Sequence, residues 1–191
     1  MNLAWRVRSI LLDPPGAWRE IAQDGGDAAS LLTGYVALLA LVPAIFGFIG
    51  ACVVGAVVPG AGLVRAPVMA SLSGAVFGYV VSCATLLVLG LLIELMAPAF
   101  GGRRDFTSAF KLAVYAYTPV WLAGIFLLAP GLRFLGLFGF YGAYILWTGL
   151  PVLMKAPKQK ATAFTALAVV CAGALTIGGA AAQRALFGPA F

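Results

Sequence analysis

The sequence predicts an all-α polytopic integral membrane protein, a bundle of five transmembrane helices with a short amphipathic N-terminal segment. Of the 191 residues, 63% are hydrophobic and 9% are charged. A soluble globular domain carries about 45–50% and about 25% of these classes. The chain also contains long, nearly uncharged runs, and only helices and closed barrels can cross a bilayer. These runs are too long for barrel strands, so a helical bundle is expected.

A spanning helix needs about 20 mostly apolar residues, because it crosses about 30 Å of hydrocarbon at about 1.5 Å per residue. Five stretches meet this requirement and form an expected transmembrane domain over residues 31–191. The expected spans are residues 31–58, 68–97, 112–129, 134–154 and 163–182. The last span is rich in Ala and Gly rather than Leu, so a four-span chain stays open as an alternative.

Residues 1–30 form the largest polar segment, which we expect to be cytoplasmic or interfacial. Residues 2–12 predict a short amphipathic helix, since four apolar residues recur at helical spacing. These are Leu3, Val7, Ile10 and Leu11. Asp13 followed by Pro14 is typical of the start of a second short helix. Anchoring in the headgroup layer and docking of a cytosolic protein are both open interpretations.

The basic residues are distributed unevenly between the expected spans. With a cytoplasmic N-terminus, the inner segments hold nine of them and the outer segments three. The inner ones are Arg6, Arg8, Arg19, Arg103, Arg104, Lys111, Lys155, Lys158 and Lys160, and the outer ones are Arg65, Arg133 and Arg184. This asymmetry follows the positive-inside rule and predicts a cytoplasmic N-terminus and a C-terminus on the opposite side. Membrane lipid is the expected partner, whereas no basic stripe with interleaved aromatics indicates nucleic-acid binding.

Glu94 is the one ionisable residue inside an expected span, near its cytoplasmic end. A carboxylate in hydrocarbon is costly unless it has a partner or contacts water. Arg103 and Arg104 follow within ten residues, so an interfacial ion pair is expected. A proton or substrate site and a partner-binding determinant are the alternatives.

Tyr115, Tyr117 and Pro119 cluster in the third expected span. Pro119 removes one backbone hydrogen bond, and the Thr118 hydroxyl can satisfy the freed carbonyl, so a structural kink is expected and a ligand site is the alternative. Small residues also recur every four positions in the first two spans, at Gly47, Ala51 and Gly55 and at Gly74, Gly78 and Ser82. Such stripes favour close helix packing, either within the chain or in a homo-oligomer.

The chain contains no histidine, and its three cysteines lie far apart in apolar runs. The usual residues of general-base chemistry and of metal sites are therefore missing. We expect no enzymatic activity, no catalytic residue, no cofactor and no metal ion.

Several short motifs occur in a characteristic order along nearly the whole chain. They are Ile10-Leu11-Leu12-Asp13-Pro14 followed by Trp18, Ser30-Leu31-Leu32-Thr33-Gly34-Tyr35 leading to Pro43, Glu94-Leu95-Met96-Ala97-Pro98 with Phe100-Gly101-Gly102, Tyr115-Ala116-Tyr117-Thr118-Pro119, and Gly149-Leu150-Pro151-Val152-Leu153-Met154. This order resembles the bacterial members of the Ypt-interacting protein (Yip) family of small five-span membrane proteins. The resemblance implies five spans, a cytoplasmic N-terminus and location in a bacterial inner (plasma) membrane.

The resemblance and the polar groups together define a candidate functional or structural motif. Its members are Glu94, Pro98, Gly101, Gly102, Tyr115, Tyr117 and Pro119. Eukaryotic relatives bind small Rab-type GTPases and act in vesicle traffic, but this chain lacks their long cytosolic N-terminal region.

Two functions are expected from the sequence. The leading one is a non-catalytic membrane protein that organises or recruits a protein partner through the N-terminal segment or the cytoplasmic loops. The alternative is a small transporter or lipid-handling protein that uses Glu94 and the helix break at Tyr115–Pro119. A hydrated cavity lined by Glu94 or Tyr117 would favour the transporter, and a dry closed bundle would favour the scaffold.

Overall fold

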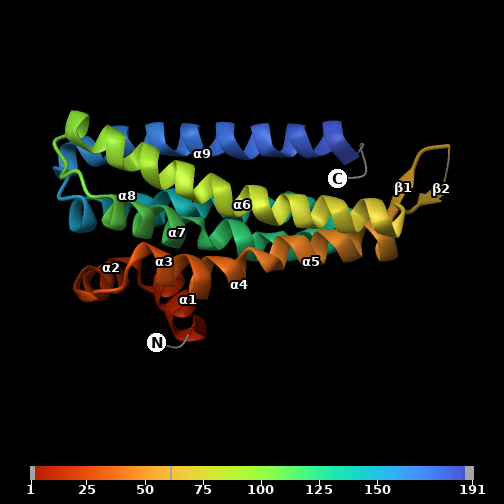
Figure 1. Cartoon of the computed structure of the whole chain (residues 1–191), viewed down its shortest axis with the longest axis horizontal. Coiled ribbons are helices and arrows are strands. Elements are labelled where there is room, and N and C mark those ends of the chain that lie inside the picture. Colours follow the sequence, from red (N-terminus) through yellow and green to blue (C-terminus); the bar gives the residue numbers. More distant parts are fainter. Residues whose placement is uncertain (1–2, 61, 188–191) are drawn as a thin grey trace.

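The computed structural model describes residues 3–60 and 62–187, which form an elongated bundle of helices (Figure 1). Within these residues, five helical segments are long and apolar enough to cross a membrane. They are Ala28–Val54, Val68–Phe100, Phe106–Leu128, Gly131–Leu153 and Lys158–Phe187. The prediction of an all-α bundle with five spans is confirmed.

The N-terminal segment consists of two short helices, α1 (Leu3–Leu12) and α2 (Pro14–Gln23). The Asp13 carboxylate accepts a hydrogen bond from the backbone N–H of Gly16 at 3.1 Å, and Pro14 occupies the first helical position. The predicted N-cap of the second helix is therefore present. Both helices lie beside one end of the bundle (Figure 1).

The first span is a chain of short helical pieces rather than one regular helix. In order, these are α3 (Ala28–Leu31), the π-helical turn η1 (Leu32–Val36), α4 (Ala37–Leu39), α5 (Leu41–Ile49) and a second π-helical turn η2 (Gly50–Val54). The interruption at Ala40 precedes Pro43, which has no N–H to continue the ladder. A Cβ on Gly124 would lie 2.6 Å from the Pro43 Cβ, so a bare backbone lets the two segments approach closely.

A β-hairpin follows the first span, although the sequence predicts helix as far as residue 58. Strand β1 (Ala56–Val58) pairs antiparallel with β2 (Gly62–Val64). The chain leaves the helix at Gly55, whose φ of +77° suits a residue without a side chain. These residues are as apolar as the span itself, so hydropathy does not separate the two.

The other four spans are more regular, with 3₁₀ turns at several ends. They comprise α6 (Val68–Met96) with η3 (Ala97–Phe100), α7 (Phe106–Ala123) with η4 (Gly124–Leu128), η5 (Pro130–Phe140) with α8 (Tyr141–Leu153), and α9 (Lys158–Phe187). Helix α7 begins six residues before the expected start at 112, because the fully buried Ala109 and Phe110 extend its packed face. The fourth span begins with the 3₁₀ stretch η5 at Pro130, four residues before the expected start at 134.

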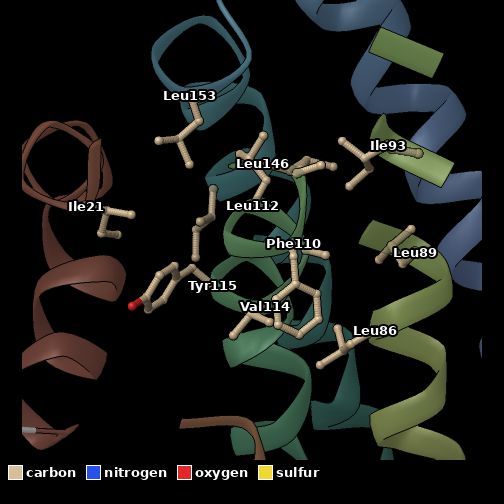
Figure 2. Packing of buried hydrophobic residues seen from close by; sticks show 14 of the residues in the cluster. Ile21, Leu86, Leu89, Ile93, Phe110, Leu112, Val114, Tyr115, Leu146 and Leu153 are labelled. Carbon is tan, nitrogen blue, oxygen red and sulfur yellow. The ribbon is translucent and has the colours of Figure 1, made fainter. Parts of the chain in front are cut away.

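Helix α7 lies at the centre of the bundle. Half of its most apolar stretch is buried, against 17–28% for the corresponding stretches of the other four spans. Figure 2 shows the Phe110 ring between Val114 of the same helix and Leu86 on α6, while Leu146 on α8 lies above them. Apolar side chains such as Val76 and Val170 are exposed on the outer faces, where a bilayer would surround them.

The small residues of α6 are used inside the chain. The Gln183 side chain of α9 donates to the Gly74 carbonyl at 2.9 Å, and the Trp121 indole donates to the Ser82 hydroxyl at 3.0 Å. The absence of bulky side chains on this face lets α9 and α7 approach α6. Packing within the chain therefore explains this stripe.

Candidate functional site

Glu94 lies in the last turn of α6, and its carboxylate meets the guanidinium of Arg104 at 3.3 Å. The Glu94 side chain is 16% exposed and that of Arg104 is 61% exposed. The ion pair expected from the sequence is thus present, with Arg104 as the partner, while Arg103 pairs with Asp105 at 3.0 Å. A pair this open to solvent contributes little to stability.

Pro98, Gly101 and Gly102 form the tight connection between α6 and α7. The 3₁₀ turn η3 ends at Gly101, which has φ of +76°, and the Gly102 N–H donates to the Ala97 carbonyl at 2.8 Å. The next residue, Arg103, donates its N–H to the Met154 carbonyl at 2.6 Å. This bond joins the α6–α7 connection to the α8–α9 connection, so the motif holds two loops together.

Asp105 precedes α7 and organises its first turn. Its carboxylate accepts a hydrogen bond from the Ser108 hydroxyl at 2.5 Å and contacts the Arg103 guanidinium. The Ser108 hydrogen bond, followed by the charge and hydrogen bond of Arg103, lowers the pKa of Asp105 below its usual value despite partial burial. The carboxylate is therefore ionised at neutral pH, as suits the positive end of a helix dipole.

Tyr115 and Tyr117 point to opposite sides of α7, since two residues rotate a helix by about 200°. The Tyr115 ring is 5% exposed and packs edge-on against Tyr35, with ring centroids 4.9 Å apart. The Tyr117 hydroxyl shares a hydrogen bond of 3.0 Å with Thr176 on α9. The structure therefore separates the two tyrosines that the sequence places together. Each tyrosine lines a different cavity, and Glu94 lines neither of these cavities.

Pro119 lies inside α7, which continues through it to Ala123. The Thr118 hydroxyl donates to the Val114 carbonyl at 3.5 Å and shares a hydrogen bond of 2.9 Å with the Tyr35 hydroxyl. The Thr118 hydroxyl thus bonds to the Val114 carbonyl. It does not bond to the Tyr115 carbonyl, which is the one that Pro119 leaves without its helical N–H partner. Thr118 and Tyr35 together tie the first span to α7.

Arg6 is the polar residue that sequence reasoning missed. The sequence places it outside the apolar face of α1, but its side chain is 3% exposed. Its guanidinium pairs with Asp24 at 2.9 Å and lies 3.8 Å from Glu20, while Tyr115 lies under it at 5.9 Å from the ring centroid. The two acidic residues along α2 are the signal that could have indicated its burial.

Trp18 fixes the N-terminal segment to the bundle. Its indole N–H donates to the Ile145 carbonyl at 3.0 Å and lies 3.2 Å from the Thr148 hydroxyl, both on α8. Nearby, the Tyr141 hydroxyl donates to the Leu11 carbonyl at 2.9 Å. The apolar face of the segment, including the buried Ile10, therefore packs on protein.

Two cavities lie on opposite sides of α7. One, of about 310 Å³, is bordered by the N-terminal segment, the start of the first span and α7, and it is lined by charged and polar side chains as well as apolar ones. The other, of about 350 Å³, is almost wholly apolar, lies among α6, η5, α7, α8 and α9, and includes Tyr117. Among the described residues, no three side chains of the metal-binding types His, Cys, Asp and Glu gather.

Five apolar spans, of which α7 is the most buried, define a polytopic integral membrane protein. Residues 8–180 match the family model of the Yip1 domain, and the chain belongs to this family. It is similar to the inner membrane protein YohC of Escherichia coli K12, with 29% identity over 137 residues that cover 70% of each chain. The same protein of Escherichia coli O6:H1 matches equally. No solved structure shows a significant match.

Proposed function

We propose that this chain is a non-catalytic protein of a bacterial inner membrane that recruits a partner protein through its N-terminal segment. The observation that carries this proposal is the firm attachment of that segment to the bundle through Trp18. Because the segment is docked on the bundle, the outer face of α1 and α2 is already ordered. A partner that binds this face therefore does not have to meet the entropy cost of ordering it. Arg8, Leu12 and Arg19 are exposed on this surface, a combination that suits an acidic and partly apolar protein surface.

The proposed orientation has the N-terminus and two connections in the cytoplasm. Figure 1 shows α1 and α2 at the same end of the bundle as the α6–α7 and α8–α9 connections, while β1, β2 and the end of α9 lie at the other end. The two connections contain Arg103, Arg104 and Lys155, and Lys158 begins α9. The positive-inside rule then supports placing this end in the cytoplasm.

Site-specific photo-crosslinking in native membranes tests the proposal. A photoreactive residue at Leu12 should form an adduct with one discrete protein, and the charge reversal Arg19→Glu should abolish that adduct. A matched probe at Val76, which is exposed on α6, should label lipid only. If the Leu12 probe also labels lipid only, the segment lies against headgroups and the recruitment proposal fails.

A lipid-handling function is the second candidate, and one observation favours it. The apolar cavity of about 350 Å³ is wide enough to accept hydrocarbon, and Tyr117 with Thr176 provides a polar spot in its wall. Glu94, by contrast, lines neither cavity. Reconstituted vesicles decide between the candidates: lipid scrambling that falls in Tyr117→Phe supports this one, and absence of scrambling removes it.

A further inference from the structure

The polar cavity of about 310 Å³ has the features of a ligand site. Its wall is assembled from α1, the connection between α2 and α3, the start of the first span and α7. Its polar and charged side chains are Arg6, Asp24, Asp27, Ser30, Tyr35, Lys111 and Tyr115. These come from segments up to about a hundred residues apart, so the cavity exists only because the N-terminal segment is docked.

The Tyr115 hydroxyl lacks a protein partner in this cavity. The Tyr115 side chain is 5% exposed, and its hydroxyl makes no hydrogen bond within the described ranges; its oxygen is not among the fully buried unpaired polar atoms, so it is open to the cavity. The hydroxyls of Tyr35 and Tyr117, in contrast, both have partners. Figure 2 shows the Tyr115 oxygen turned toward the N-terminal helices. The Tyr115 hydroxyl is therefore a hydrogen-bond donor that a ligand in the cavity can use.

The charges around the cavity are balanced. Arg6 and Lys111 are cationic, while Asp24 and Asp27 are anionic. Lys111 donates one N–H to the Asp24 carbonyl at 2.6 Å, which holds its ammonium at the cavity and leaves donors for a second acceptor. Hydrogen bonds from Ser30 lower the pKa of Asp27, so this carboxylate stays ionised. A wall of zero net charge suits a ligand that carries both signs better than a simple anion.

The position of the cavity indicates where such a ligand comes from. Ala28, next to Asp27, begins the first span, and Lys111 lies in the second turn of the third span. The cavity is therefore level with one edge of the apolar bundle, where the headgroups of a bilayer lie. Leu3 and Leu31 also line it and offer apolar contact to the part of a lipid that enters the hydrocarbon.

We propose that this cavity binds the headgroup of a phospholipid that carries a phosphate and a primary ammonium, as in phosphatidylethanolamine. The phosphate accepts hydrogen bonds from the Tyr115 hydroxyl and the Lys111 ammonium. The lipid ammonium donates to the Asp27 carboxylate, and Arg6 adds positive charge beneath the phosphate. This site is independent of partner recruitment, which uses the outer face of α1 and α2.

Lipid binding to the purified full-length protein in detergent, measured by native mass spectrometry, tests the proposal. Phosphatidylethanolamine should bind more tightly than phosphatidylcholine, whose quaternary ammonium cannot donate to Asp27, and more tightly than anionic phosphatidylglycerol. Tyr115→Phe should weaken phosphatidylethanolamine binding about fivefold or more, because it removes one hydrogen bond to a charged group and keeps the packed ring. Tyr144→Phe, on α8 and outside the lining of both cavities, is the matched control and should leave binding unchanged.

A second variant separates the two halves of the headgroup. Asp27→Asn keeps the N-cap of α3 and removes the charge, so it should abolish the preference for phosphatidylethanolamine over phosphatidylglycerol. Soluble phosphoethanolamine should compete only at far higher concentration than the lipid. Equal binding of all three lipids, or no effect of Tyr115→Phe, overturns the proposal, and competition by phosphoethanolamine at lipid-like concentration overturns the lipid source.

Discussion

The indole of Trp18 lies against the bare backbone of Gly149. A Cβ at Gly149 would lie 2.5 Å from Trp18 Cε2 and 2.5 Å from Leu112 Cδ2, closer than real Cβ contacts come. Helix α2 can therefore approach α8 only because position 149 has no side chain. This contact explains how a short N-terminal segment is held on the bundle with Trp18 fully buried.

The variant Gly149→Ala should detach the N-terminal segment. The added methyl group must displace Trp18 or Leu112, and overpacking of this kind costs about 1–3 kcal/mol. A cysteine at Ala17, which is 1% exposed, should become reactive to a water-soluble maleimide in this variant. Gly173→Ala is the control, because a Cβ there meets nothing within 4 Å and should leave Ala17→Cys protected.

Replacement of Arg6 by lysine should destabilise the segment even though the charge is kept. A lysine cannot hold Asp24 with a planar guanidinium while also lying over the Tyr115 ring. We expect the free energy of unfolding to fall by about 1–3 kcal/mol, the range for a lost hydrogen bond between charged groups. Denaturant titration followed by intrinsic tryptophan fluorescence measures this loss, and the exposed Arg8→Lys should change stability little. Equal stability of the two variants would contradict the assigned role of Arg6.

Gly101, in the loop after α6, should contribute more to stability than the ion pair between Glu94 and Arg104. Gly101→Ala places a side chain on a residue with φ of +76°, which costs about 1–2 kcal/mol. Glu94→Gln removes a pair whose arginine is 61% exposed, and such pairs contribute about 0–1 kcal/mol. In thermal unfolding in detergent, Gly101→Ala should therefore have a lower Tm than Glu94→Gln. The reverse order would indicate that Glu94 has a deeper role than this pair.

The stabilising effect of Ser108 on α7 should depend on pH. Because its hydrogen bond lowers the pKa of Asp105 from the ordinary 3.8, the contribution is fully present above that value and disappears as the pH falls through the lowered pKa. Wild type and Ser108→Ala should thus differ in stability by a constant amount above about pH 5 and converge toward about pH 2. A difference that persists unchanged at the acidic end would rule out the Asp105 carboxylate as the partner.

The orientation can be checked with single cysteines in a chain whose Cys52, Cys83 and Cys171 are replaced by serine. A cysteine at the exposed Gln159 should react with an impermeant maleimide only in inverted vesicles. A cysteine at Leu63, which is 57% exposed in the hairpin, should react only in intact spheroplasts. Labelling of both positions from one side would contradict the proposed topology.

The apolar runs predict the architecture well because the bilayer imposes one simple requirement on every span. The Asp13–Pro14 helix start and the Glu94 ion pair were also predictable, since both depend on residues close in sequence. Helix ends were harder to locate. Hydropathy cannot show that the chain turns at Gly55, because the strands that follow are equally apolar.

Long-range contacts account for what the sequence did not reveal. The neighbours of Arg6 within α1 do not indicate that it is buried, because its partners are Glu20 in α2, Asp24 just after α2 and Tyr115 in α7. The opposite directions of Tyr115 and Tyr117 follow from helical geometry. The surroundings of their hydroxyls do not, because Thr176 on the distant α9 bonds to Tyr117 while Tyr115 lines a cavity next to the N-terminal segment. The functional roles of the candidate residues stay predictions.

The 3₁₀ stretch η5 lengthens the fourth span. A 3₁₀ helix rises about 2.0 Å per residue and an α-helix about 1.5 Å, so the eleven residues Pro130–Phe140 reach about 22 Å instead of about 16 Å. An α-helix over the same residues would be about 6 Å shorter. The fourth span therefore covers more of the hydrocarbon thickness per residue than a fully α-helical span would.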